Sequence, residues 1–184
     1  MSQKLAGKSI LILVDNLYED MELHYPFYRL KEEEARVVVA GPKVREKYVG
    51  KHGMPCQSEI DFQSVQESEF DALVIPGGFA PDKLRRDPKV LELVQMFHQK
   101  EKSIAFICHA GWVPISAKVI KGVKCTSVSA IKDDLVNAGA NWVNEAVVVD
   151  RHFISSRTPD DLPLFCRGII EILSDKQLNK TALV

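Results

Sequence analysis

The stretch "AFICHAGW" (residues 105–112) decides the fold, because an apolar run ends there in a cysteine and a histidine followed by small residues. The run starts at residue 103, carries no charge and is typical of a buried strand. Residues 111–120 follow with the pattern of a short helix. A thiol at such a turn lies near backbone N–H groups and a positive helix end, which favour the thiolate. Cys108 is therefore a candidate nucleophile, and a packed structural cysteine is the alternative.

The same order of strand and helix repeats outward from this stretch. Apolar runs predict strands over residues 9–14, 35–42 and 70–78, and a hairpin over residues 146–157. Amphipathic segments predict helices over residues 21–34, 87–102, 131–140 and 159–176. This alternation predicts a flavodoxin-like three-layer α/β sandwich, with a mostly parallel sheet and helices on both faces. The length of 184 residues and a hydrophobic content of 46% predict a single domain over residues 1–184.

Composition and charge exclude several classes of function. The 24 Lys and Arg residues balance 25 Asp and Glu residues, so we expect no nucleic-acid or membrane partner. The first apolar run is too short for a signal peptide or a membrane span, which predicts a cytoplasmic protein. The four cysteines form no CxxC pair and the histidines show no ligand spacing, so no metal or cofactor is predicted.

Three of the predicted parallel strands end in residues that suit chemistry. Carboxyl ends of neighbouring strands meet at one edge of a sheet, so these residues should converge. His109 could act as base for the Cys108 thiol, although adjacent side chains in a tight turn point apart unless the backbone is strained. The N–H groups of Gly78 and His109 could hold an oxyanion, and Gly78 could equally belong to a plain turn. Glu19 either complements the helix dipole or shares a proton with Cys108.

Five segments together resemble the ThiJ/PfpI superfamily over nearly the whole chain. They are "ILILVDNLYEDMELHYPFYRLKEEE", "FDALVIPGGFAPDKLR", "IAFICHAGW", "IKDDLVNAGANWV" and "VVVDRHFISSRTPDDLP". The chain is most similar to the PfpI-like branch, whose members are described as intracellular cysteine peptidases, cofactor-independent glyoxalases and deglycases. The resemblance implies an enzyme of one of these kinds.

The resemblance also implies a set of site residues. Cys108 matches the nucleophile and His109 the histidine that follows it, while Glu19 matches the buried glutamate that hydrogen-bonds the sulfur. Gly78 and the backbone of His109 match the oxyanion hole. Asp82 matches an acidic residue that a neighbouring subunit contributes to orient the histidine, which implies a homodimer or homohexamer. Its side chain is one methylene shorter than the glutamate of some relatives.

The cleft itself has two further candidates. Tyr18 and Trp112 lie beside the predicted site in the sequence, and their rings would give the cleft apolar walls. Core packing is the alternative role for both side chains. Cys125 and Cys166 lie in apolar surroundings in the sequence and are predicted to be packed and inert.

The function predicted first is a cofactor-free enzyme that uses Cys108 to attack methylglyoxal, glyoxal or their adducts on protein or nucleotide, as a stress-protective deglycase or glyoxalase. A cysteine peptidase is the second enzymatic hypothesis, because it needs the same nucleophile. A hypothesis of another class makes Cys108 an oxidative-stress sensor or the protein a chaperone. An amidotransferase is disfavoured because no carboxylate lies two residues beyond His152, and no GxGxxG or P-loop motif supports nucleotide binding.

Overall fold

The fold is built around one mostly parallel sheet, shown in a computed structural model that describes residues 3–181, with side chains up to residue 174. Seven strands of the described chain form this sheet in the order β10-β11-β7-β6-β1-β2-β5. Only the pairing of β10 with β11 is antiparallel. These strands are β1 (Ser9–Leu13), β2 (Arg36–Gly41), β5 (Ile60–Asp61), β6 (Ala72–Ile75), β7 (Ser103–Ile107), β10 (Val147–Asp150) and β11 (Phe153–Ser156).

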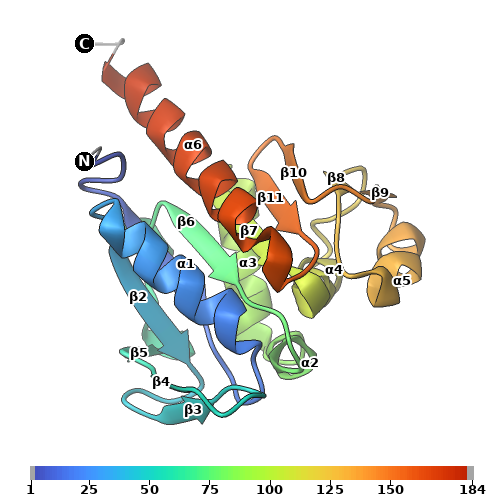
Figure 1. The fold of residues 1–184 in the computed structure, drawn as a ribbon, viewed down its shortest axis with the longest axis horizontal. Helices are drawn as coiled ribbons and strands as arrows, with labels where there is room; N and C mark the ends of the chain where they lie inside the picture. Colours follow the sequence, from blue (N-terminus) through green and yellow to red (C-terminus); the bar gives the residue numbers. More distant parts are fainter. Residues whose placement is uncertain (1–2, 182–184) are drawn as a thin grey trace.

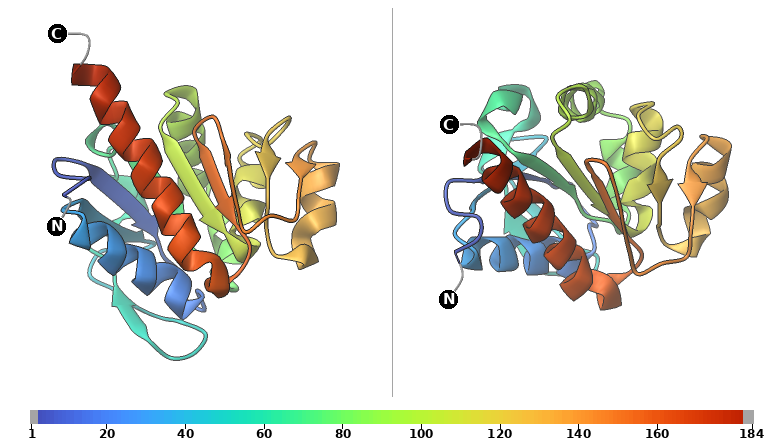
Figure 2. Two further views of the ribbon diagram at one scale, coloured as in Figure 1. Left: turned by 45° about the horizontal axis from the view of Figure 1, so that its top comes forward. Right: turned by 90° about the horizontal axis from the view of Figure 1, so that it is seen from above.

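Two layers of helices cover the sheet (Figures 1 and 2). Helices α1 and α6 pack together on one face of the sheet. On that face α1 lies over β2, and α6 lies over β7, β10 and β11. Helix α3 packs on β6 and β7 from the other face, with α4 beside it. The helices are α1 (Asp20–Glu32), α2 (Ala80–Leu84), α3 (Pro88–Gln99), α4 (Trp112–Ser116), α5 (Lys132–Asn137) and α6 (Leu162–Thr181). The predicted flavodoxin-like three-layer sandwich is therefore confirmed.

The central strands are apolar on both faces because helices cover both. Every residue of β6 and β7 is buried, as is all of β1 after Ser9. This explains why these strands appear in the sequence as unbroken apolar runs without alternation. Helix α3 begins where the sequence places it, with Pro88 in its first turn and the Asp87 carboxylate accepting the backbone N–H of Lys89 at 2.8 Å.

Two small two-stranded sheets lie outside the central one. Strands β3 (Lys47–Val49) and β4 (Pro55–Gln57) form a hairpin, which the sequence analysis does not predict. Strands β8 (Lys124–Cys125) and β9 (Asn141–Trp142) pair with each other and form no part of the main sheet. The hairpin is the more consequential of the two, because its turn reaches the candidate site.

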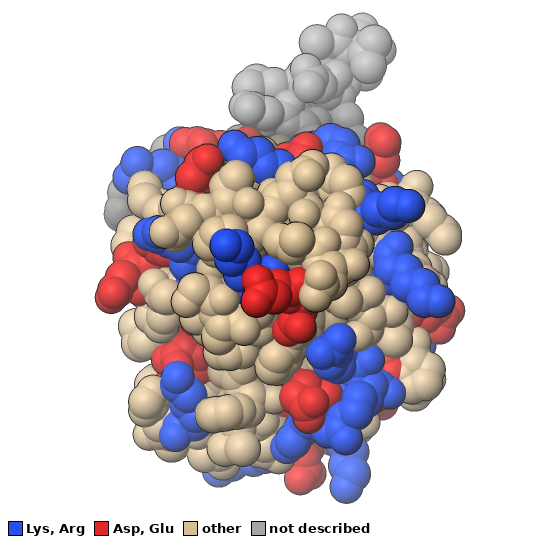
Figure 3. All heavy atoms as spheres, turned by 90° about the vertical axis from the view of Figure 1, so that its right-hand side faces the viewer, with Lys and Arg blue, Asp and Glu red and all other residues tan. Residues whose placement is uncertain are grey.

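The surface carries both signs of charge. On the face shown in Figure 3, the Lys and Arg side chains lie among Asp and Glu side chains, in keeping with a formal net charge of −1. Among the described residues, none of the helices combines the length and the apolar character needed to cross a bilayer.

Candidate active site

The site lies at the carboxyl edge of the sheet, where the ends of β1, β6 and β7 meet as predicted. The segment after β1 pairs with the segment after β6: the N–H of Glu19 bonds the carbonyl of Gly77 at 3.1 Å, and the N–H of Phe79 bonds that of Leu17 at 2.8 Å. A Cβ atom placed on Gly77 would lie 2.7 Å from the Cβ of Cys108. The glycine therefore allows the end of β7 to approach the end of β6 closely.

Cys108 occupies a strained turn. It follows β7 directly, begins a 3₁₀ turn (Cys108–Gly111), and has a φ of 62°, which a non-glycine residue rarely adopts. This left-handed backbone brings the Cys108 Sγ to 3.3 Å from the Nδ1 of its own neighbour, His109. The strain that the sequence analysis identified as necessary for contact between adjacent side chains is thus present. The predicted turn between strand and helix is a 3₁₀ turn that leads into the short helix α4.

The thiol faces a cavity of about 420 Å³. The cavity is lined by side chains from the ends of β1, β6 and β7, the turn between β3 and β4, and the segments preceding α5 and α6: Glu19, Glu22, Lys51, His52, Gly78, Phe79, Cys108, His109, Val128, Thr158 and Pro159. Cys108 is half-buried, so its sulfur is reachable from this cavity. Cys125 and Cys166 are buried, which confirms their predicted packing.

The carboxyl beside the thiol belongs to Glu22, and the prediction of Glu19 in this role is wrong. Glu22 hydrogen-bonds Cys108, its Oε2 accepts the N–H of Gly77 at 2.7 Å, and the residue is fully buried. Its Oε1 is buried and has no hydrogen-bond partner among the described residues. Glu19 lies at the N-cap of α1 in an extended conformation and directs its carboxylate to Lys51 instead. A pattern in the sequence marks Glu22, because it lies four residues before Pro26 and eight before Leu30 on the buried face of α1.

The protonation states follow from burial and from the neighbouring charges. Burial raises the pKa of Glu22 to about 8, so its carboxyl is protonated at pH 7 and donates a hydrogen bond. Burial, together with the charge of Glu22, raises the pKa of the Cys108 thiol to about 12, while the N–H groups of His109 and Gly78 oppose this rise. Burial, and then the cation of Lys51, lower the pKa of His109, which keeps the imidazole neutral. The sequence favours a preformed thiolate, whereas the structure favours a thiol in contact with a neutral base.

The two backbone donors predicted for an oxyanion hole flank the sulfur. The N–H groups of Gly78 and His109 both hydrogen-bond the Cys108 Sγ. Gly78 has a φ of 79°, and a Cβ atom there would lie 2.4 Å from the backbone nitrogen of Glu19. The position therefore requires glycine on grounds of both backbone conformation and space.

The two aromatic residues predicted to wall the cleft do not line it. Tyr18 is fully buried, because it pairs with Gly78 and turns its side chain into the core, where its hydroxyl donates to the carbonyl of Met54 at 2.6 Å. Trp112 stands beside the imidazole of His109, with ring centroids 5.3 Å apart, and its Nε1 donates to Asp134 at 2.7 Å. Trp112 therefore supports His109 and does not form a cavity wall.

Asp82 lies on α2 at the surface of the chain. Its side chain is 60% exposed and pairs with Arg86 at 2.9 Å. Among the described residues, no carboxylate hydrogen-bonds His109, whose contacts are the Cys108 sulfur and the Trp112 ring. In the part of the chain that the structure describes, no acid therefore orients the imidazole.

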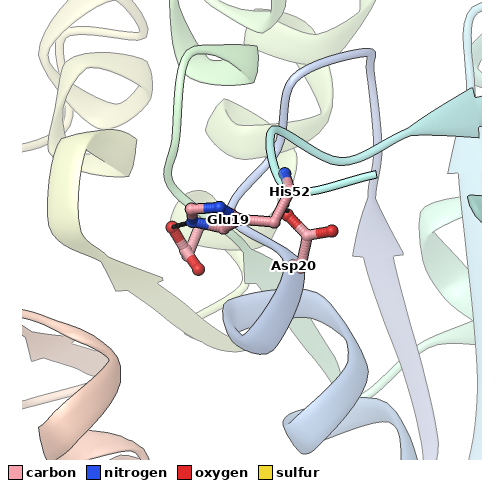
Figure 4. Close-up of side chains that lie close together, drawn as sticks. All are labelled: Glu19, Asp20 and His52. Carbon is pink, nitrogen blue, oxygen red and sulfur yellow. Dashed lines mark hydrogen bonds and ion pairs between the residues drawn. The ribbon is translucent and has the colours of Figure 1, made fainter. Parts of the chain in front are cut away.

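One group of side chains has the composition of a metal site. Oxygen and nitrogen atoms of Glu19, Asp20 and His52 lie within 4.8 Å of one another (Figure 4). The carboxylate oxygens are already engaged, because Asp20 accepts the backbone N–H groups of His52 and Met54 and Glu19 pairs with Lys51 at 2.5 Å. The group serves to attach the β3–β4 hairpin to the start of α1.

Lys51 and His52 line the site although the sequence analysis assigns them no role. They come from a polar hairpin turn that is distant in sequence from the three strand ends, and no local motif marks them. Only the tertiary contacts of the hairpin bring them to the cavity.

Known proteins are similar to this chain over most of its length. A model of the DJ-1/PfpI family matches residues 8–172. A deglycase of Pyrococcus abyssi is 44% identical over 89% of this chain and 98% of its own length, and the deglycase PfpI of Pyrococcus furiosus is 43% identical over 89% and 98%. A Bacillus subtilis protein provisionally named a cysteine protease is 38% identical over 91% of this chain and 99% of its own length.

Solved structures show the same fold. The chain aligns with a TM-score of 0.89 and 41% identity to a two-domain protein from Anabaena variabilis, which contains DJ-1/ThiJ/PfpI-like and ferritin-like domains; the match covers 90% of this chain and 48% of that one. Drosophila melanogaster DJ-1beta aligns with a TM-score of 0.86 and 27% identity over 100% of this chain and 99% of its own.

Proposed function

The chain belongs to the DJ-1/PfpI family, and from this premise we propose that it is a cofactor-free, cysteine-dependent cytoplasmic enzyme of the deglycase or glyoxalase type. Its substrates are methylglyoxal, glyoxal or their adducts on protein or nucleotide. The observation that carries the proposal is the contact of the Cys108 Sγ with a neutral imidazole at 3.3 Å, inside a cavity that reaches solvent. Relatives named as deglycases support the choice of substrate class.

In the first step His109 takes the proton of the Cys108 thiol while the sulfur adds to the aldehyde carbon. A C–S bond forms, and the carbonyl oxygen, which faces the N–H groups of Gly78 and His109, takes the proton from His109 and becomes the hemithioacetal hydroxyl. The protonated carboxyl of Glu22 stabilises the sulfur by donating to it, without adding a repelling charge.

In the second step the hydrogen on the former aldehyde carbon is transferred, as a proton through His109, to the adjacent carbonyl carbon. The first carbon is oxidised to a thioester while the second is reduced to an alcohol, so no external oxidant or reductant is needed. Water then cleaves the thioester and restores the thiol. Methylglyoxal and one water give lactate and a proton, and an amine or thiol adduct also releases its amine or thiol.

The test measures lactate formed from methylglyoxal by the purified protein, with a glycated peptide and casein as parallel substrates. Cys108→Ser should reduce the rate at least about a thousandfold, because it removes the attacking atom. Cys56→Ser is the matched control, since it removes another half-buried thiol outside the cavity and should leave the rate unchanged. Equal lactate formation by the Cys108→Ser protein would overturn the proposal.

The same experiment addresses the alternatives. Cleavage of casein without lactate formation would favour the cysteine peptidase, to which the name of the Bacillus subtilis relative points. Absence of any turnover, together with oxidation of Cys108 by peroxide, would favour the oxidation sensor.

A further inference from the structure

The turn of the β3–β4 hairpin is fixed to the start of α1 by backbone contacts. The N–H of Lys51 bonds the carbonyl of Tyr18 at 2.9 Å. The Asp20 carboxylate accepts the N–H of His52 at 2.9 Å and that of Met54 at 2.8 Å. None of these bonds uses the side chain of Lys51, so the turn holds its position without it.

The Lys51 side chain instead enters the cavity that contains the thiol. Its Nζ pairs with the Oε2 of Glu19 at 2.5 Å, and it lines the same cavity as Cys108 and His109. The Glu19 side chain is 7% exposed while that of Lys51 is 34% exposed, so the carboxylate is the fixed partner and the ammonium is the group that meets solvent and ligand.

We propose that the ammonium group of Lys51 stabilises the Cys108 sulfur when it becomes negative, and that Glu19 is a positioning residue that holds this ammonium in the cavity. The inference rests on the proposed function only in taking Cys108 as the nucleophile. It gives Glu19 an indirect role in the site in place of the direct contact with the sulfur that the sequence predicts.

Electrostatics support this assignment. The hydrogen bond with Glu19 and the charge of Glu19 raise the pKa of Lys51, and Cys108 and Glu22 add to that effect when they are ionised. Lys51 is thus a cation at neutral pH. The interaction of two charges is reciprocal, so an ammonium stabilised by a thiolate stabilises that thiolate to the same extent. Burial and Glu22 raise the pKa of the thiol to about 12, so a cation in the same cavity acts against both effects.

The experiment compares the rate at which iodoacetamide alkylates Cys108 in three variants, measured between pH 6 and 10 on the peptide that contains Cys108. Lys51→Gln removes the charge and keeps a donor for Glu19, and Lys51→Arg keeps both. Lys47→Gln removes the same charge from an exposed position on the same hairpin, outside the cavity. Alkylation follows the thiolate fraction, so it reports on the sulfur without requiring turnover.

We expect Lys51→Gln to slow alkylation about tenfold at pH 7.5, which corresponds to a rise of about one in the thiol pKa. Lys51→Arg and Lys47→Gln should retain the wild-type pH profile. A wild-type profile for Lys51→Gln would overturn the inference, whether or not the protein consumes methylglyoxal. Slower alkylation without any lactate formation would instead support the inference and overturn the proposed function.

A second measurement leaves Lys51 in place. Iodoacetate and iodoacetamide differ in charge at similar size, so their rate ratio at Cys108 reports the local potential. Glu19→Gln keeps an oxygen for the Lys51 Nζ and removes the opposing charge, and should raise this ratio severalfold. An unchanged ratio would contradict a Lys51 charge that acts on the sulfur.

Discussion

At the scale of single residues, the site depends on a carboxyl that burial keeps protonated. Glu22 has no exposed surface, and Glu19 adds a negative charge nearby; both effects oppose ionisation. The N–H of Gly77 favours the ionised form, but burial outweighs it. Glu22 can therefore donate to sulfur at neutral pH, which an ionised carboxylate cannot do.

A prediction on pH-dependent stability follows from the raised pKa of Glu22. Between its ordinary value of 4.5 and about 8, the unfolded chain ionises this carboxyl while the folded chain keeps its proton. The folded state then binds more protons, so its stability falls as pH rises through this range. Glu22→Gln has no such proton, and its free energy of unfolding should rise relative to wild type from pH 5 to pH 8. One pKa unit corresponds to about 1.4 kcal/mol, which limits the gain to about 5 kcal/mol.

Urea denaturation at a series of pH values measures this difference, and Glu67→Gln is the control with the opposite sign. Glu67 is also buried, but its ion pairs with Lys102 and Lys100 outweigh burial and lower its pKa. The ion pairs of Glu67 therefore stabilise the fold at neutral pH, and this stabilisation is lost as pH falls towards the lowered pKa of Glu67 in the folded state. Glu67→Gln should cost about 2 kcal/mol at pH 7 and less in acid. Parallel stability curves for wild type and Glu22→Gln would contradict the protonated carboxyl.

At the scale of elements, the sequence predicts those parts of the fold that depend on local patterns. Strands β1, β6 and β7 are apolar runs with clear ends, so their place and the convergence of their carboxyl ends could be predicted. The hairpin β3–β4 could not, because its strands have only three residues each and are mostly exposed. The choice between Glu19 and Glu22 depended on where α1 begins, and helix boundaries are set by caps and tertiary contacts within one or two residues.

The turn between β6 and α2 gives a second prediction. Gly78→Ala should destabilise the fold by at least about 3 kcal/mol and reduce activity, because a Cβ would lie 2.4 Å from the Glu19 nitrogen and 2.6 Å from the Leu17 oxygen. Both are backbone atoms, which move only with the paired segments. Relief of the clash would displace the Gly78 N–H from the sulfur.

Gly7→Ala is the matched control for this prediction, since Gly7 has the same φ of 79° but nothing within 4 Å of the added Cβ. It should cost only about 1 kcal/mol, from backbone conformation alone. Thermal or urea denaturation of both variants separates the cost of the backbone conformation from the cost of the steric clash. Equal losses for the two would show that the close approach at Gly78 is not rigid.

At the scale of the whole molecule, the described part of one chain holds most of the proposed catalytic site but not all of it. The thiol and the imidazole come from the turn that follows β7, and the carboxyl that donates to the thiol comes from α1. In the described part of the chain, no acid orients His109, and Asp82 lies exposed with only Arg86 as partner. A cysteine–histidine pair usually has a third group that orients the base. We therefore propose that a second subunit supplies Asp82 in a homodimer or homohexamer.

Complementation between two impaired variants tests this assembly. Asp82→Asn should lower lactate formation and leave alkylation of Cys108 unchanged, whereas Cys108→Ser abolishes both. If Asp82 acts across the interface of a dimer, a mixed pair holds one intact site, made of Cys108 from one chain and Asp82 from the other. Chains unfolded together and refolded in equal amounts should then recover about a quarter of wild-type turnover, because half the dimers are mixed and half their sites are intact. If Asp82 acted within its own chain, no mixed site would be intact, and the refolded mixture would show only the mean of its two parents.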